Sequence, residues 1–180
     1  MTIDEIVTAA GIAKGSFYRY FDDKSQLADH LFSPMALGVR AALQGLNDHL
    51  LHIGDPKDLS RAYGRLAAEI AALVADKLDL LRLYLQENRG PDRGARASII
   101  ELRKDIESAA FKLTRVAQEH ALLRDDYDHR LGTLATIGAV ERLLFAFLSG
   151  ETVGADTAAQ LIGVLLDGVR ATTHNGDATL

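Results

Sequence analysis

The sequence has 180 residues, enough for one medium domain or two small ones, and its net charge of −5 gives no global attraction to nucleic acid. It contains no cysteine, which excludes disulfides and thiolate metal sites and is compatible with a reducing compartment. The longest apolar stretches, Thr157 to Leu166 and Leu131 to Val140, are shorter than the roughly 20 residues that span a bilayer. We therefore expect a cytoplasmic protein without a membrane partner.

The N-terminal segment predicts two short helices joined by a tight turn. Apolar side chains recur at three- and four-residue steps over residues 3–10, and Thr2 and Glu5 fit a capping box at the start of that helix. Gly11 follows at a position where a left-handed backbone favours glycine. A second helix is expected over residues 14–21. Two helices with so short a connection indicate a helix-turn-helix.

The second of these helices is expected to have one buried side, while its remaining surface carries polar and charged groups. Phe17 and Phe21 are four residues apart and can share the buried face. The remaining surface offers two cations, a phenol, a hydroxyl and a glycine, namely Lys14, Gly15, Ser16, Tyr18 and Arg19. Such groups suit phosphate oxygens and base edges in a DNA major groove.

The run AAGI-x-KGSFYRYF-xx-K-xx-L, from Ala9 to Leu27, resembles the DNA-binding domain of the tetracycline-repressor (TetR) family from its second helix onward. By that resemblance, the residues that face base edges are Lys14, Gly15, Ser16 and Arg19. Those that hold phosphates are Thr2, Tyr18, Tyr20 and Lys24. The competing interpretation is an ordinary amphipathic helical hairpin with solvated charges.

Three features depart from the family pattern. Members place another helix before the point where this sequence starts, so we expect the first helix of the domain to be missing from it. Residues 1–32 also carry three basic side chains against five acidic ones, where a DNA-binding module is expected to be basic. Finally, Ala13 stands where the family usually has a hydroxyl residue that caps the second of these helices. The missing cap lowers the stability of that helix by on the order of 1 kcal/mol.

The rest of the sequence predicts helices only, so the expected fold class is all-α. A helix capped by Asp23 should kink or break near Ser33, before Pro34, and resume as far as Gly54. Asp55-Pro56 starts the next helix, and further helices are expected over 77–86 and from Gly94 to about Leu123. The predicted domains are an N-terminal helix-turn-helix domain, 1–32, and a helical ligand-binding and dimerisation domain, 33–175. The tail from His174 to Asp177 is expected to fray.

The last two predicted helices, Tyr127 to Leu148 and Thr157 to Ala171, differ from the others. Both are apolar over a wide arc and rich in glycine and alanine, so they need partners on two sides. In the family that this chain resembles, the corresponding helices pair with their copies in a dimer. We expect a homodimer through these two segments, with a monomer core as the alternative.

The same resemblance implies a small-molecule cavity in the body. Candidates to line it are Tyr63, Tyr84, Gln86, Phe111, Glu141 and Phe145, each of which could instead be simple core. Glu141-Arg142 interrupts an apolar helix, either as a salt bridge or solvated edge or as a polar group inside a cavity. No metal site or cofactor is expected, since His49 and His52 lack a third ligand at a fitting spacing.

The expected function is a ligand-responsive transcriptional regulator. As the resemblance implies, it would be a repressor that binds a pseudo-palindromic DNA operator as a dimer and is released by a small apolar molecule. The alternative is a dimeric helical ligand-binding or interaction module with impaired DNA binding. An enzyme is not expected, because no catalytic constellation is found in the sequence.

Overall fold

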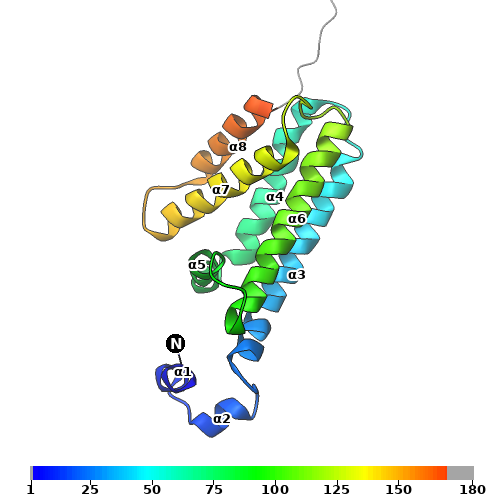
Figure 1. Ribbon diagram of the computed structural model, residues 1–180. Helices are drawn as coiled ribbons and strands as arrows, with labels where there is room; N and C mark the ends of the chain where they lie inside the picture. Colours follow the sequence, from blue (N-terminus) through cyan, green and yellow to red (C-terminus); the bar gives the residue numbers. More distant parts are fainter. Residues whose placement is uncertain (1, 170–180) are drawn as a thin grey trace, which may run out of the picture.

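The computed structural model describes residues 2–169, apart from the side chain of Ala155, and every regular element in that range is a helix. A small N-terminal part contains α1 (Ile3–Ala10) and α2 (Lys14–Tyr18), which lie below the body in Figure 1. The body contains α3 (Lys24–Leu50), α4 (Leu59–Val74), α5 (Leu78–Glu87), α6 (Ala97–Glu119), α7 (His129–Leu148) and α8 (Ala155–Val169). Two 3₁₀ turns, η1 (Pro56–Asp58) and η2 (Gly94–Arg96), precede α4 and α6. The predicted all-α fold class is confirmed.

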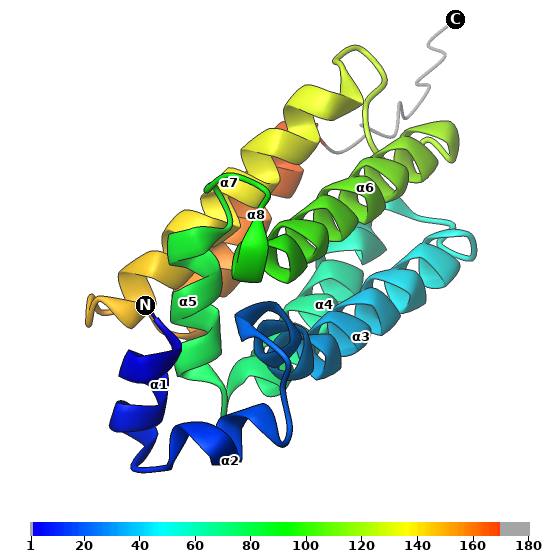
Figure 2. The same cartoon turned by 60° about the horizontal axis from the view of Figure 1, so that its bottom comes forward.

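Helix α3 connects the N-terminal part to the body. Its apolar stripe, from Phe32 through Val39 to Leu50, is buried against α6 and α4. Figures 1 and 2 show α6 running beside α3 along the body. The helix continues through Pro34, so the break expected near Ser33 is wrong. Apolar packing on both sides of Pro34 holds the helical backbone despite the lost N–H donor. The predicted domain boundary after residue 32 therefore falls inside a helix rather than in a linker.

Several helix starts are fixed by the capping residues that the sequence indicated. Asp23 accepts hydrogen bonds from the backbone N–H groups of Ser25 and Gln26, at 2.7 and 2.9 Å. Asp55 accepts from the Lys57 N–H at 2.8 Å, although the turn that it opens is 3₁₀ before α4 begins. Each carboxylate satisfies donors that a helix start leaves open.

The ends of some helices differ from the expectation. Helix α2 ends at Tyr18 instead of Phe21, and α6 ends at Glu119 instead of Leu123. Leu122 and Leu123 turn back so that both N–H groups donate to the carbonyl of Ala117, and both side chains are buried in the core. The burial of two leucines therefore outweighs another helical turn. The predicted ends beyond residue 169, at residues 171 and 175, and the predicted fraying of His174 to Asp177 lie outside the described residues.

Helices α7 and α8 lie side by side on the outer edge of the body (Figures 1 and 2). Within α7 only Thr133 and Ala146 are buried, although the helix is mostly apolar. Its 20 residues are long and apolar enough to cross a membrane by length and composition alone, a test that core helices of soluble proteins also pass. Glu141 and Arg142 lie within it, however, and charged groups in a bilayer are costly. An exposed apolar face of this kind calls for a covering partner.

Candidate nucleic-acid interface and effector site

The first helix is held by the local interactions that the sequence predicted. The Thr2 hydroxyl accepts from the Glu5 N–H at 3.2 Å, and the Glu5 carboxylate accepts from the Thr2 N–H at 2.5 Å, which confirms the capping box. These hydrogen bonds lower the pKa of Glu5. Gly11 ends the helix with φ of 66°, a conformation that a residue with a Cβ rarely adopts. The turn therefore directs the chain sharply into α2.

A small aromatic cluster fixes α2 against its neighbours. Phe17 is 3% exposed and lies 5.6 Å, between ring centroids, from Phe21, which in turn contacts His30 of α3 at 5.6 Å. Val7 is the buried residue of α1. Burying a phenylalanine contributes roughly 1.5–3 kcal/mol, so Phe17 is the main anchor of the reading helix. Ala13 gives no side-chain cap, as the sequence indicated.

This anchoring leaves the other faces of α2 in solvent. Ser16 is half-buried, while the other residues expected to contact DNA are exposed: Thr2, Lys14, Gly15, Tyr18, Arg19, Tyr20 and Lys24. The exposed set combines cations, phenols and a glycine on one short helix and its flanks. A short helix that presents donors to solvent can enter a major groove and contact phosphates on either side.

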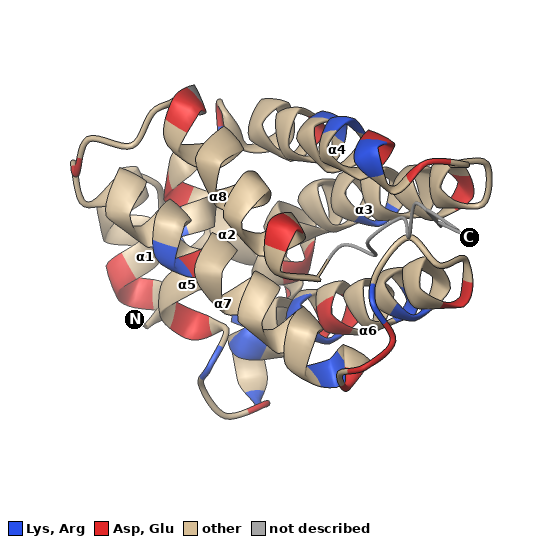
Figure 3. Ribbon diagram, turned by 90° about the horizontal axis from the view of Figure 1, so that it is seen from above, with Lys and Arg blue, Asp and Glu red and all other residues tan. Residues whose placement is uncertain are grey.

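Acidic residues lie directly beside this surface. The Lys14 ammonium is 2.8 Å from the carboxylate of Asp4 on α1, and this contact raises the pKa of Lys14. Figure 3 shows the acidic start of α1 at the same end of the molecule as α2. One of the acidic residues that outnumber the basic ones in this segment is therefore in direct contact with one of its few cations.

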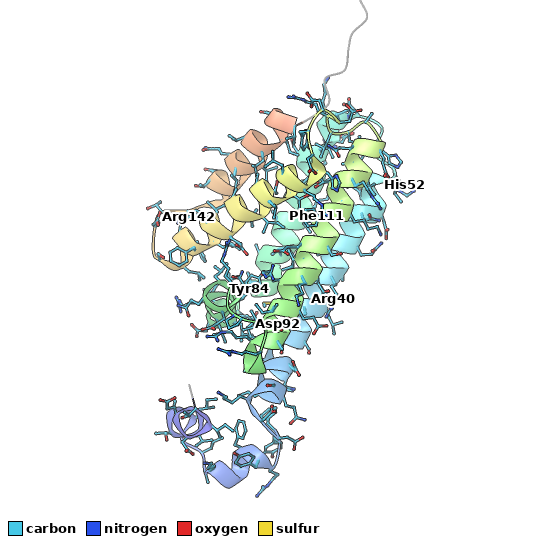
Figure 4. All side chains as sticks on the ribbon, in the orientation of Figure 1. Arg40, His52, Tyr84, Asp92, Phe111 and Arg142 are labelled. Atoms are coloured by element: carbon cyan, nitrogen blue, oxygen red, sulfur yellow. The ribbon has the colours of Figure 1, made fainter. Side chains whose placement is uncertain are left out.

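A polar cluster lies where α5 meets α7. Asn88, directly after α5, is 1% exposed and donates from Nδ2 to Oε1 of Glu141 at 2.8 Å. Arg89 donates to the other carboxylate oxygen at 2.6 Å. Tyr84, labelled in Figure 4, lies one turn earlier, and its burial raises its pKa to about 12. The cluster therefore combines a buried amide, a buried phenol and a largely buried carboxylate with an exposed guanidinium.

The other predicted lining residues lie elsewhere. Tyr63 on α4 is half-buried near Tyr127, and burial raises its pKa to about 12. Phe111 on α6 packs edge-on against His129, with ring centroids 6.4 Å apart. Gln86 is exposed, and Phe145 is 52% exposed on α7. The structure thus brings Tyr84 and Glu141 into one cluster and leaves the remaining four outside it.

The structure also separates Glu141 from its neighbour in sequence. Arg142 points to Glu151, at 3.3 Å, and its guanidinium lies 5.9 Å from the Phe145 ring. Sequence reasoning did not identify Asn88, which comes just after the helix predicted over 77–86. The signal that could have identified Asn88 is its polar amide directly after an apolar helix. Asn88 Oδ1 has no hydrogen-bond donor within residues 2–169.

The fold and the exposed reading helix define a helix-turn-helix DNA-binding protein with a helical body. Residues 1–31 match the model of the family "Bacterial regulatory proteins, tetR family". No curated protein matches the chain.

Two solved structures share the fold. One is the fatty acid degradation regulator FadR from Bacillus halodurans, with 20% identity, a TM-score of 0.64, and coverage of 94% of this chain and 89% of that one. The other is the transcriptional regulator FadR from Bacillus subtilis in complex with stearoyl-CoA, with 15% identity, a TM-score of 0.65 and the same coverage of 94% and 89%. At this identity the likeness concerns the fold.

Proposed function

We propose that this protein is a homodimeric transcriptional repressor that binds a pseudo-palindromic operator and is released by a small apolar effector. The observation that carries the proposal is the reading helix α2, which is anchored by Phe17 and exposes Lys14, Tyr18 and Arg19. In this proposal Lys14, Gly15, Ser16 and Arg19 face base edges. Thr2, Tyr18, Tyr20 and Lys24 hold phosphates.

The proposed dimer uses the exposed apolar face of α7 and α8. Side chains that a monomer would leave in water include Leu131, Leu134, Phe145 and Val164, which is 72% exposed. A Cβ built on Gly163 of α8 would meet no atom within 4 Å in the protomer, so this backbone is open to close approach by another helix. A two-fold axis here would place the two α2 helices for two half-sites of one operator.

The dimer is tested by replacing Gly163 with arginine. We expect a charge at a close helix contact to dissociate the dimer, as seen by light scattering, with Gly54→Arg as a control because Gly54 also meets open space but lies on the loop after α3. A Gly163→Arg protein that stays dimeric contradicts this interface.

The proposed effector site includes the Tyr84–Glu141 cluster and, as predictions, Tyr63, Gln86, Phe111 and Phe145. Stearoyl-CoA is the first probe, since one structure of the same fold was solved in complex with it. We expect an effector to raise the midpoint temperature of thermal unfolding by mass action and to release DNA.

We further propose that residues 1–32 act as the DNA-reading domain and residues 33–175 as the effector and dimer domain. The protein would be cytoplasmic and without catalytic activity.

The decisive experiment is a selection of bound duplexes from a random DNA library by the full chain. Enrichment of two half-sites related by a dyad supports the repressor. The second candidate function is a dimeric ligand-binding module with impaired DNA binding, favoured by the Lys14–Asp4 contact, which neutralises one of the few reading cations. Effector binding without any enriched DNA would establish that second function instead.

A further inference from the structure

A groove of about 500 Å³ lies between α3 and α6, outside the proposed effector cluster. Four α6 residues line it, Asp105, Ser108, Ala109 and Lys112, and their three- and four-residue steps place them on one face of that helix. The face that carries Arg103 and Thr114 points elsewhere, and Thr114 bonds to Thr133 of α7 at 2.9 Å. The groove is therefore separate from the contact with α7.

One wall of the groove contains a buried polar atom without a partner. Asn47 on α3 is 7% exposed, and its Nδ2 makes only a long contact of 3.3 Å with Asp48. Its Oδ1 has no hydrogen-bond donor in the described part of the chain. A buried amide oxygen left unpaired is costly, so this position favours an incoming O–H or N–H group.

The charges of the groove are arranged in two levels. The Arg40 guanidinium, labelled in Figure 4, lies 2.5 Å from Asp105 across the groove. Asn47 follows Arg40 by seven residues, and Lys112 follows Asp105 by seven, on helices that run side by side in the same direction (Figures 1 and 2). At a rise of 1.5 Å per residue, Asn47 and Lys112 stand at a common level roughly 10 Å from the ion pair.

Lys112 supplies the positive charge at that level. It is exposed, and it has no ion-pair partner within residues 2–169, whereas Arg40 is already neutralised by Asp105. The wall between the two levels is partly apolar, with Leu43 and Ala109.

We propose that this groove binds a small carboxylate that carries a hydroxyl or amino group on the carbon next to the carboxylate. The carboxylate pairs with the Lys112 ammonium, and the neighbouring O–H or N–H donates to Asn47 Oδ1. An apolar side chain of the ligand lies along Leu43 and Ala109 toward the Arg40–Asp105 pair.

Isothermal titration calorimetry on the full chain with four probes of one carbon skeleton tests the chemistry. The probes are 2-hydroxy-4-methylpentanoate, leucine, 4-methylpentanoate, which lacks the donor, and 2-hydroxy-4-methylpentanamide, which lacks the charge. We expect one or both of the first two to bind, and the last two to bind at least about tenfold more weakly. Binding of only one of the first two identifies the donor as hydroxyl or amine.

Two variants locate the binding in the groove. Asn47→Leu should abolish the preference for the donor-bearing acid while leaving the protein folded, because it removes an unpaired buried acceptor. Lys112→Gln should weaken binding of both acids by about tenfold, whereas Lys57→Gln, the same charge change on η1, should not. Equal binding of all four probes, no binding at millimolar concentration, or an unchanged donor preference in Asn47→Leu overturns the proposal. Should Asn47→Leu not fold, unchanged binding in Lys112→Gln is sufficient to overturn it.

Discussion

The ammonium of Lys14, on the proposed reading helix, lies 2.8 Å from the carboxylate of Asp4 on α1. Both side chains are more than half exposed, so the ion pair itself contributes little to stability. Its importance concerns DNA binding, because a phosphate must compete with Asp4 for the same cation and also approach a negative charge. We therefore predict that the contact weakens DNA binding and is not needed for the fold.

Asp4→Asn should raise affinity for operator DNA. The change frees Lys14 and removes one repulsive charge, so the salt slope should steepen by about one phosphate contact. Fluorescence anisotropy at several salt concentrations measures both quantities. Asp79→Asn is the matched control, since Asp79 is a fully exposed acid on α5 that also pairs with a cation. An equal gain in both variants would attribute the effect to net charge alone.

Replacing Lys24 and replacing Arg19 should impair DNA binding in different ways. Lys24→Gln is expected to weaken binding to all sequences alike and to flatten the salt slope by about one. Arg19→Ala should instead relax the sequence preference, because a base contact discriminates by about 1–3 kcal/mol. Titration across operator variants distinguishes the two, and an unchanged preference in Arg19→Ala would mean that Arg19 reads no base.

The Asn88–Glu141 hydrogen bond should matter for stability, and the adjoining Arg89 contact should not. Asn88→Ala leaves the Glu141 carboxylate, which is 16% exposed, without its buried donor, at an expected cost of about 1–3 kcal/mol. Arg89 is 76% exposed, so Arg89→Gln should cost about 1 kcal/mol at most. Urea unfolding measures both. Similar losses in the two variants would show that the exposed ion pair carries the interaction.

Hydrogen exchange should divide the protein into regions of different protection. Only Val7 is buried in α1 and only Phe17 in α2, so amides from Ile6 to Phe17 should exchange faster than those in the middle of α3. Amides of α7 and α8 should gain protection as protein concentration rises, because the proposed dimer would cover their apolar faces. Protection of α7 that does not depend on concentration would contradict this.

The buried phenols should make the fold sensitive to alkali. Burial raises the pKa of both Tyr63 and Tyr84 from 10.0 to about 12, so the folded state favours the neutral phenol. Their contribution to stability is complete below pH 10 and is lost as pH rises from 10 to 12, where the unfolded chain ionises first. Tyr84→Phe should reduce this loss in urea unfolding followed against pH. An unchanged pH dependence would show that Tyr84 ionises without unfolding.

The sequence alone determined the features that depend on near neighbours in the chain. The Thr2–Glu5 capping box, the left-handed Gly11 and the Asp23 cap involve groups only a few residues apart, so local geometry specifies them. The Phe17 and Phe21 spacing likewise fixed which face of α2 is buried, and hence which residues remain exposed for DNA.

The tertiary structure decided the features in which distant segments meet. Pro34 stays helical and α6 ends early because side chains on either side are buried against other helices, a contribution that local propensity does not contain. Asn88 meets Glu141 across 53 positions of sequence, and Arg40 meets Asp105 across 65. Helical periodicity places each of these residues on a face of its own helix but carries no information on which other face it will contact. Only the packing of α3, α5, α6 and α7 around one core sets those pairs.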